Sequence, residues 1–112
     1  MVAILDYGIG NVYSIYNMLK KIGVEAEVTS DASKVKRAGK IILPGVGHFS
    51  YCMQQLRKAS FFNELEDKIL GNKTPVLGVC VGCQMLMEHS EEGNEKGLGW
   101  IKGEVIRFKE NE

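Results

Sequence analysis

Short runs of apolar or alternating residues follow one another along the chain, separated by longer segments in which apolar residues recur every three or four positions. The short runs indicate strands, and the longer period indicates amphipathic helices. The predicted order is a strand at residues 2–5, a helix at 12–22, a strand at 26–29, a helix at 30–38, a strand at 40–43, a helix at about 60–71, a strand at 75–79, a helix from Cys80 to about residue 87 and a strand at 104–108.

This alternation of strands and helices predicts an α/β fold of the flavodoxin-like, doubly wound kind, with a mostly parallel sheet and helices on both faces. No internal repeat or linker interrupts the pattern, so we expect residues 1–112 to form one domain. No element is predicted after residue 108, and we therefore expect the sheet to be incomplete toward the C-terminus.

Glycine, proline and serine suggest where the predicted elements end. Gly23 stands where the helix at 12–22 would stop, and Pro44 with the glycines after it predicts a loop behind the third strand. Ser60 is the predicted N-cap of the helix at 60–71. That helix would bury one apolar face, formed by Phe61, Phe62, Leu65 and Ile69.

The 112 residues carry 14 Lys and Arg against 14 Asp and Glu, without strong clustering of either sign. This balance provides no basic surface for nucleic acid or an anionic membrane and favours a small molecule or another protein as the partner. The sequence contains neither a signal peptide nor an apolar run long enough to span a bilayer, which predicts a cytoplasmic location. Three cysteines, an odd number, point to a reducing compartment.

The most specific chemical signal is a G-x-C-x-G pattern around Cys80, where a predicted strand passes into a helix. A nucleophile on so tight a turn has a strained backbone, and the flanking Gly78 and Gly82 avoid collisions with neighbouring elements. The helix N-terminus favours the thiolate, and the Val81 N–H becomes an oxyanion donor. The pattern therefore predicts a nucleophilic cysteine, although a buried structural cysteine would also fit it.

Cys80 and Cys83 also form a C-x-x-C pair at a helix start, as in a thioredoxin-like dithiol. This alternative gives no role to Gly78 or to the glycines at residues 44–47. A zinc site would need two further ligands, and Cys52 and the histidines do not have matching spacing, so no metal site is predicted.

The Pro44-Gly45-Val46-Gly47 segment follows the third strand, so in a doubly wound sheet it reaches the same carboxyl edge as Cys80. Its bare N–H groups can complete an oxyanion hole together with Val81, although a plain turn remains the alternative. A G-x-G at residues 8–10 lacks the third glycine of a dinucleotide fingerprint and is weak evidence for a cofactor. We expect no cofactor.

Taken together, these motifs resemble the glutaminase subunit of imidazole glycerol phosphate synthase, a class I glutamine amidotransferase of histidine biosynthesis. The resemblance covers nearly the whole chain. It is carried by DYGIGN at residues 6–11, PGVGHF at 44–49, GVCVGCQ at 78–84, SEEG at 90–93 and GLGWIKGEVIRF at 97–108.

The resemblance implies that Cys80 forms a glutamyl thioester and that L-glutamine is the substrate. It also implies roles for the neighbouring residues: an oxyanion hole from Gly47, Val81 and Val46, and substrate contacts from Gln84 and Gly45.

The resemblance further implies a heterodimer with a cyclase subunit that receives the ammonia. The loops at the carboxyl edge would face this partner through Tyr7, Asn11, Pro44 and His48.

The sequence departs from the family pattern in two places. Cys83 stands where the family has methionine, and the family's catalytic His and Glu belong to a C-terminal segment that is absent from this sequence. His48 is expected to be a loop residue, and His89 a surface residue two turns along the helix after Cys80. We therefore expect no glutamine turnover by this chain alone, and two alternatives stay open: a paralogue supplying ammonia for sugar amidation in surface polysaccharides, and a non-catalytic interaction module.

Overall fold

The computed structural model describes residues 1–108 of the chain. Within this range the elements are, in order, β1 (Val2–Leu5), α1 (Val12–Lys21), β2 (Ala26–Thr29), α2 (Ala32–Arg37), β3 (Lys40–Gly45), α3 (Phe49–Lys58), α4 (Phe62–Glu66), the π-helical turn η1 (Asp67–Gly71), β4 (Val76–Cys80), α5 (Val81–Met85), β5 (His89–Ser90), the 3-10 turn η2 (Glu92–Asn94), β6 (Glu95–Lys96) and β7 (Glu104–Val105). None of the helices in this range is both long and apolar enough to cross a membrane.

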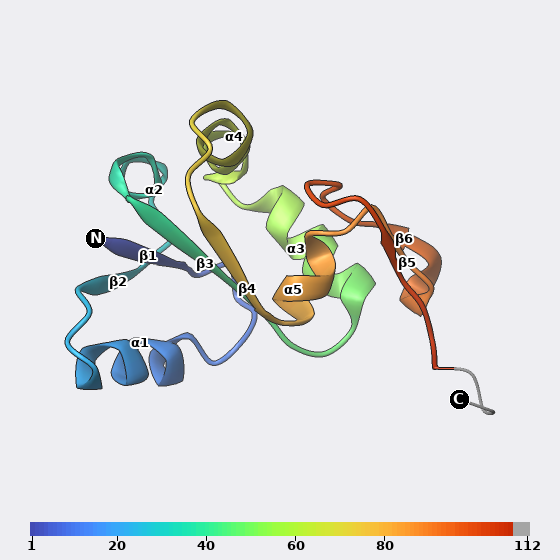
Figure 1. Cartoon of the computed structure of the whole chain (residues 1–112), viewed down its shortest axis with the longest axis horizontal. Coiled ribbons are helices and arrows are strands. Elements are labelled where there is room, and N and C mark those ends of the chain that lie inside the picture. Colours follow the sequence, from blue (N-terminus) through green and yellow to red (C-terminus); the bar gives the residue numbers. More distant parts are fainter. Residues whose placement is uncertain (109–112) are drawn as a thin grey trace.

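The main sheet has four parallel strands in the order β2-β1-β3-β4 (Figure 1). This is the flavodoxin-like, doubly wound order predicted from the sequence. All strands point the same way, so the chain leaves β1, β3 and β4 at one carboxyl edge. The register sets Gly45, the last residue of β3, opposite Cys80, the last residue of β4. The fold thereby brings the glycine-rich segment at residues 44–47 and the G-x-C-x-G motif around Cys80 together.

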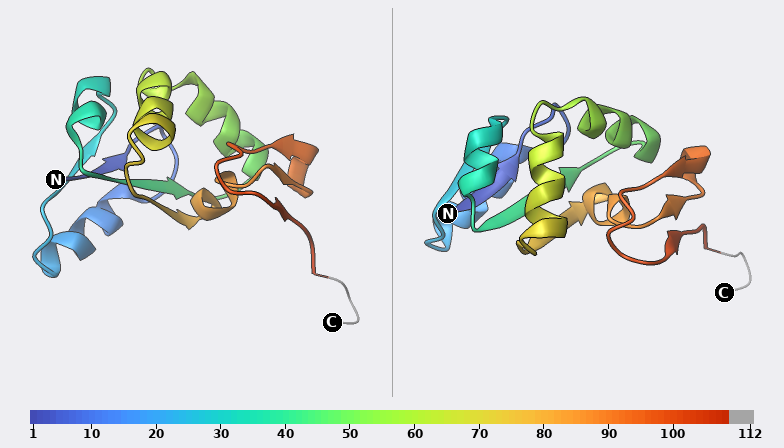
Figure 2. Two further views of the ribbon diagram at one scale, coloured as in Figure 1. Left: turned by 45° about the horizontal axis from the view of Figure 1, so that its top comes forward. Right: turned by 90° about the horizontal axis from the view of Figure 1, so that it is seen from above.

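Helices cover both faces of this sheet, as Figures 1 and 2 show. On one face α1 alone packs through its apolar stripe against a small core centred on Ile4, Val12 and Ile42. The opposite face carries α2, α3, α4 and α5 over the main core, whose largest buried side chains include Phe49 and Phe61.

A second, three-stranded sheet of order β6-β5-β7 lies at the end of the molecule away from the N-terminus (Figure 2). Its presence corrects the prediction of a helix to residue 87, because α5 ends at Met85. The following backbone pairs with distant segments instead: the Glu88 N–H bonds the Gly103 carbonyl, and the Leu98 N–H bonds Met85. The last predicted strand, at 104–108, is shortened to Glu104–Val105.

The structure differs from the predicted elements in three other places. The helix α3 was not predicted, although residues 49, 52, 53 and 56 recur with helical spacing and are all buried. The strand β3 continues through Pro44, which is tolerated because pairing with β1 has already ended at Ile42. The N-cap of α4 is Phe61 and not Ser60, whose hydroxyl instead donates to the Ser30 carbonyl.

Candidate active site

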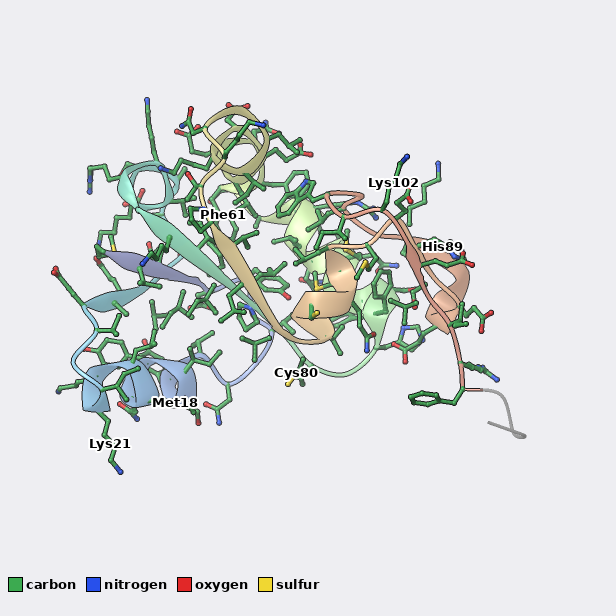
Figure 3. All side chains as sticks on the ribbon, viewed as in Figure 1. Met18, Lys21, Phe61, Cys80, His89 and Lys102 are labelled. Carbon is green, nitrogen blue, oxygen red and sulfur yellow. The ribbon has the colours of Figure 1, made fainter. Side chains whose placement is uncertain are left out.

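Cys80 ends β4 at a sharp turn into α5, and its backbone angles are φ 56° and ψ −125°. Only one other non-glycine residue within 1–108, Lys73, has a positive φ. Such a conformation costs about 1–3 kcal/mol and persists only where the surrounding structure imposes it. Figure 3 shows the Cys80 side chain projecting outward from this turn, and the residue is exposed. The predicted strained turn with an accessible thiol is therefore present.

Close backbone packing explains the glycines on either side of Cys80. A Cβ atom on Gly78 would stand 2.5 Å from the Cα of Cys83, and one on Gly82 would stand 2.0 Å from the carbonyl oxygen of Leu43. Both distances are far below contact distance. The G-x-C-x-G pattern is thus required by the way α5 packs onto β3 and β4.

The loop after β1 and the loop after β3 meet beside Cys80. A cavity of about 180 Å³ is lined by residues of both loops, α1 and the Cys80 turn: Gly10, Asn11, Ser14, Ile15, Pro44, Gly45, Val46, Val79 and Cys80. Gly45 is needed here too, because a Cβ at this position would stand 2.5 Å from the backbone nitrogen of Gly82. Gly47 follows with φ 83° and is exposed, next to the cavity in sequence but outside its lining. The expected convergence of loops is therefore present, with Gly47 at its margin.

Two buried side chains donate hydrogen bonds to carbonyls within residues 44–47, a role that the sequence did not predict for either of them. The Tyr7 hydroxyl donates to the Pro44 carbonyl, and the Cys52 thiol donates to the Val46 carbonyl at 3.2 Å. Burial is the largest cause that raises the pKa of each of these two groups, and their mutual contact raises the pKa of Tyr7 further. Both groups therefore remain protonated donors at neutral pH.

The positions of Tyr7 and Pro44 correct their prediction as partner contacts. Both are buried, so neither can present its side chain to another protein in this conformation. Asn11 and His48 are exposed and remain available. Asn11 also caps α1, because its side-chain oxygen accepts a hydrogen bond from the Ser14 N–H at 3.3 Å.

His48 is the N-cap of α3, and its Nδ1 accepts a hydrogen bond from the Ser50 N–H at 3.2 Å. A neutral ring held in this way carries its proton on Nε2 and has no free basic nitrogen. The neighbouring Phe49 N–H donates to the Glu92 carboxylate at 2.5 Å. The N-terminus of α3 is thus satisfied by two side chains, and His48 is engaged as a cap.

His89 does not lie on the helix after Cys80, where it was predicted. It belongs to β5 in the small sheet, and Figure 3 shows it well away from Cys80. Its Nδ1 lies 3.7 Å from a carboxylate oxygen of Glu104 on the neighbouring strand. The reason for the error is the early end of α5.

Gln84 lines a separate cavity of about 190 Å³ and not the one that contains Cys80. Acidic, basic and amide side chains meet there, the lining being Gln84, Ser90, Glu91, Glu92, Val105, Ile106 and Arg107. Carboxylates together with a guanidinium can bind the ammonium and carboxylate groups of an amino acid. The SEEG motif contributes three of these polar residues, Ser90, Glu91 and Glu92. The spacing of residues 90–93 alone did not reveal that they line a cavity together with Gln84.

Cys80 and Cys83 are both exposed free thiols, and Cys52 is a buried one. No cluster of three or more His, Cys, Asp or Glu side chains that could hold a metal ion occurs within residues 1–108.

Comparison with known proteins agrees with this geometry. A family model described as glutamine amidotransferase class-I matches residues 3–111. Two proteins named imidazole glycerol phosphate synthase subunit HisH 2, from Pseudomonas aeruginosa and Methanococcus maripaludis, are 45% and 47% identical over 109 residues, which is 97% of this chain and 54% of each relative. The chain thus spans about half the length of the curated relatives it matches.

A solved structure described as a glutamine amidotransferase has the same fold. It superimposes with a TM-score of 0.77 at 21% identity, over 95% of this chain and 56% of that one.

Proposed function

Because the chain belongs to the class-I glutamine amidotransferase family, we propose that it is the N-terminal part of a glutaminase domain with Cys80 as nucleophile. The observation that carries this proposal is the exposed thiol on a strained turn, beside the glycine-rich backbone of residues 44–47. Family membership also favours this reading over a dithiol redox protein, because the redox reading gives no role to that loop.

The proposed reaction begins with attack of the Cys80 sulfur on the side-chain carbonyl carbon of L-glutamine. The N–H groups of Val81 and Gly47, with the backbone at Val46, stabilise the resulting oxyanion. The C–N bond then breaks, a proton is delivered to the nitrogen, and ammonia leaves a glutamyl thioester. Attack by water on the thioester releases glutamate and restores the thiol.

The proton transfers in this scheme need a base. His48 is engaged as a helix cap and His89 lies in another sheet, so neither of the two histidines serves well. The resemblance implies a catalytic His and Glu that no motif of this sequence supplies. We propose that these residues complete the site.

The cavity around Gln84 is the proposed site for the amino-acid end of glutamine. Its acidic residues suit the α-ammonium group, and Arg107 suits the α-carboxylate. Gly45, at the end of β3, would approach the reacting end of the substrate closely because it has no side chain. This arrangement supports glutamine as the substrate class.

The proposed partner is the cyclase subunit of an imidazole glycerol phosphate synthase, to which ammonia passes for histidine biosynthesis. The names of the relatives support this acceptor over sugar amidation. The exposed residues Asn11 and His48 at the carboxyl edge are the proposed contacts. The odd number of cysteines supports the proposal of a reducing, cytoplasmic location.

The test uses the purified chain and a chloromethyl ketone analogue of L-glutamine, followed by mass mapping of the adduct. We expect modification of Cys80 that excess L-glutamine prevents and that D-glutamine does not. Equal protection by the two enantiomers, or an adduct mainly on Cys83, would contradict the proposed site.

A further inference from the structure

Pro44 is fully buried and Gly45 pairs with Cys80 at the end of β3, whereas the backbone at residues 46–47 has little apolar anchoring of its own. Gly45 and Gly47 have no side chains, and the Val46 side chain is 53% exposed. The orientation of the peptide groups around Val46 must therefore be set by hydrogen bonds to the backbone. Within residues 1–108, side-chain hydrogen bonds to the Pro44 and Val46 carbonyls come from Tyr7 and Cys52.

Both donors are fixed in the core. Cys52 on α3 is fully buried, and Tyr7 after β1 is 9% exposed. The Tyr7 hydroxyl also lies 3.5 Å from the Met85 sulfur, so α5 takes part in the same packing. The Val46 carbonyl is thus tied through Cys52 to α3, which follows it in the chain, and the Pro44 carbonyl is tied through Tyr7 to the packing of α5.

The carbonyl and N–H of one trans peptide point in opposite directions. Because the Cys52 thiol holds the Val46 carbonyl toward the core, the Gly47 N–H points away from Cys52. The Gly45–Val46 peptide lies between the Pro44 and Val46 carbonyls, each of which accepts a hydrogen bond from a buried side chain. A donor facing the wrong way would give no stabilisation to an oxyanion, so these two hydrogen bonds decide whether the loop can serve that role.

We propose that Cys52 and Tyr7 are positioning residues, which hold the backbone of residues 44–47 in the orientation needed for an oxyanion hole beside Cys80. The proposal rests on the proposed glutaminase function of the same site. It assigns a purpose to a cysteine that sequence patterns leave as an ordinary buried thiol.

The experiment compares two electrophiles on the same thiol. A chloromethyl ketone analogue of L-glutamine reacts by sulfur attack on its carbonyl carbon, which creates a thiohemiketal oxyanion. The sulfur then displaces chloride from the chloromethyl carbon, and the first C–S bond breaks as the carbonyl re-forms. Iodoacetamide reacts by direct displacement of iodide and creates no oxyanion. The ratio of the two rates at Cys80 therefore reports on the loop, whereas the iodoacetamide rate alone reports on thiol reactivity.

We expect Cys52→Ala to lower this ratio about fivefold, the effect of losing one hydrogen bond of typical net strength. Cys52→Ser, which keeps a donor, should recover most of the ratio, and Tyr7→Phe should lower it as Cys52→Ala does. Urea unfolding of each variant supplies the matched control. If Cys52 had a merely structural role, the ratio of the two rates would follow the free energy of unfolding of each variant. Cys52→Ser and Cys52→Ala would then not differ in this ratio.

The NMR signal of the Gly47 amide distinguishes failure of the loop proposal from failure of the proposed function. In one outcome, Cys52→Ala shifts the Gly47 signal, Cys52→Ser reverses the shift, and L-glutamine does not protect Cys80 from the chloromethyl ketone. This outcome would uphold the anchoring of the loop. It would overturn the glutaminase function and, with it, the oxyanion role. L-glutamine protection with an unchanged ratio and an unchanged Gly47 signal in Cys52→Ala would overturn the positioning role alone.

Discussion

Gly82 lies so close to Leu43 that a Cβ atom on the glycine would stand 2.0 Å from the Leu43 carbonyl oxygen. This contact joins α5 to β3 one residue after the helix begins, and it fixes where the Cys80 turn sits relative to the loop at residues 44–47. Leu43 is itself held in place by its pairing with Gly78 of β4. The turn and the loop are therefore held as one unit.

The first prediction is that Gly82→Ala destabilises the chain by at least about 3 kcal/mol, because the added methyl group overlaps backbone and not a flexible side chain. The urea midpoint measures this loss. Gly71→Ala is the matched control, since no atom lies within 4 Å of a Cβ at that position. Similar midpoints for the two variants would contradict the packing described here.

The second prediction concerns thiol reactivity under limiting iodoacetamide. Cys80 should react first, because it is exposed and its side chain projects outward from the strained turn at the end of β4. Cys83 should follow, and Cys52 should react only after unfolding, because it is buried. Mass mapping of the modified peptides gives the order, and early labelling of Cys52 would count against the structure at α3.

The third prediction is a loss of stability at alkaline pH. Burial raises the pKa of the Cys52 thiol above 9.0 and that of the Tyr7 phenol above 10.0 in the folded state, and the charge of Glu92 adds to the effect on Cys52. Above these values the unfolded chain loses protons that the folded chain keeps, so the free energy of unfolding falls as pH rises. Well below pH 9.0 neither group contributes a slope.

Each group can contribute at most about 1.4 kcal/mol per pH unit. Chemical denaturation at a series of pH values should therefore show a decline that begins near pH 9.0. The double variant Cys52→Ala with Tyr7→Phe retains the other titrating groups and should show a flatter decline. An identical slope in both proteins would show that the two buried donors are not its source.

The fourth prediction is that Asn11→Asp weakens the complex with a cyclase subunit about tenfold without unfolding the domain. Aspartate also caps a helix, so the hydrogen bond from the Ser14 N–H is retained. The substitution removes an amide donor and adds a charge at the exposed edge of the proposed interface, at a cost of about 1.4 kcal/mol. Titration calorimetry measures the affinity.

Asn17→Asp makes the same chemical change on the exposed surface of α1, outside the cavity lining, and serves as the control. Equal affinities for the Asn11 and Asn17 variants would point to an interface elsewhere.

The sequence was most informative about buried strands and about the carboxyl edge. The strands Val2–Leu5 and Ala26–Thr29 have the predicted bounds, because the first is a short apolar run and the second alternates apolar and polar residues. The meeting of Cys80 with residues 44–47 followed from parallel strand direction alone. By contrast, the strong loop signals at residues 44–47 hid the helical period of Phe49–Lys58 directly after them.

Long-range contacts could not be predicted from local patterns. The two-residue strand β5 pairs with β7, which lies farther along the chain and which no local period records. The same holds for Tyr7: its hydroxyl reaches the Pro44 carbonyl, 37 residues away in the sequence, only because the loops after β1 and β3 meet in the fold. A burial pattern identifies such a residue as core and gives no sign of its partner.

The last prediction is that the purified 112-residue chain does not turn over glutamine by itself. Thiol attack on an amide needs a base that also protonates the leaving ammonia and deprotonates the attacking water. His48 Nδ1 accepts the Ser50 N–H, and His89 lies in the small sheet beside Glu104, so neither is placed to serve Cys80. Loss of the base in such a triad typically costs several powers of ten in rate. A glutamate-release assay, with and without a cyclase subunit, should therefore stay at the level of Cys80→Ala.

Slow formation of a Cys80 adduct with a glutamine-like electrophile, without release of glutamate, would agree with this expectation because adduct formation needs no second proton transfer. Turnover that disappears in Cys80→Ala would contradict it. The variant His48→Asn, which retains a cap acceptor for the Ser50 N–H, would then identify the base: lost activity would assign the role to His48, and retained activity would assign it to a residue from another subunit.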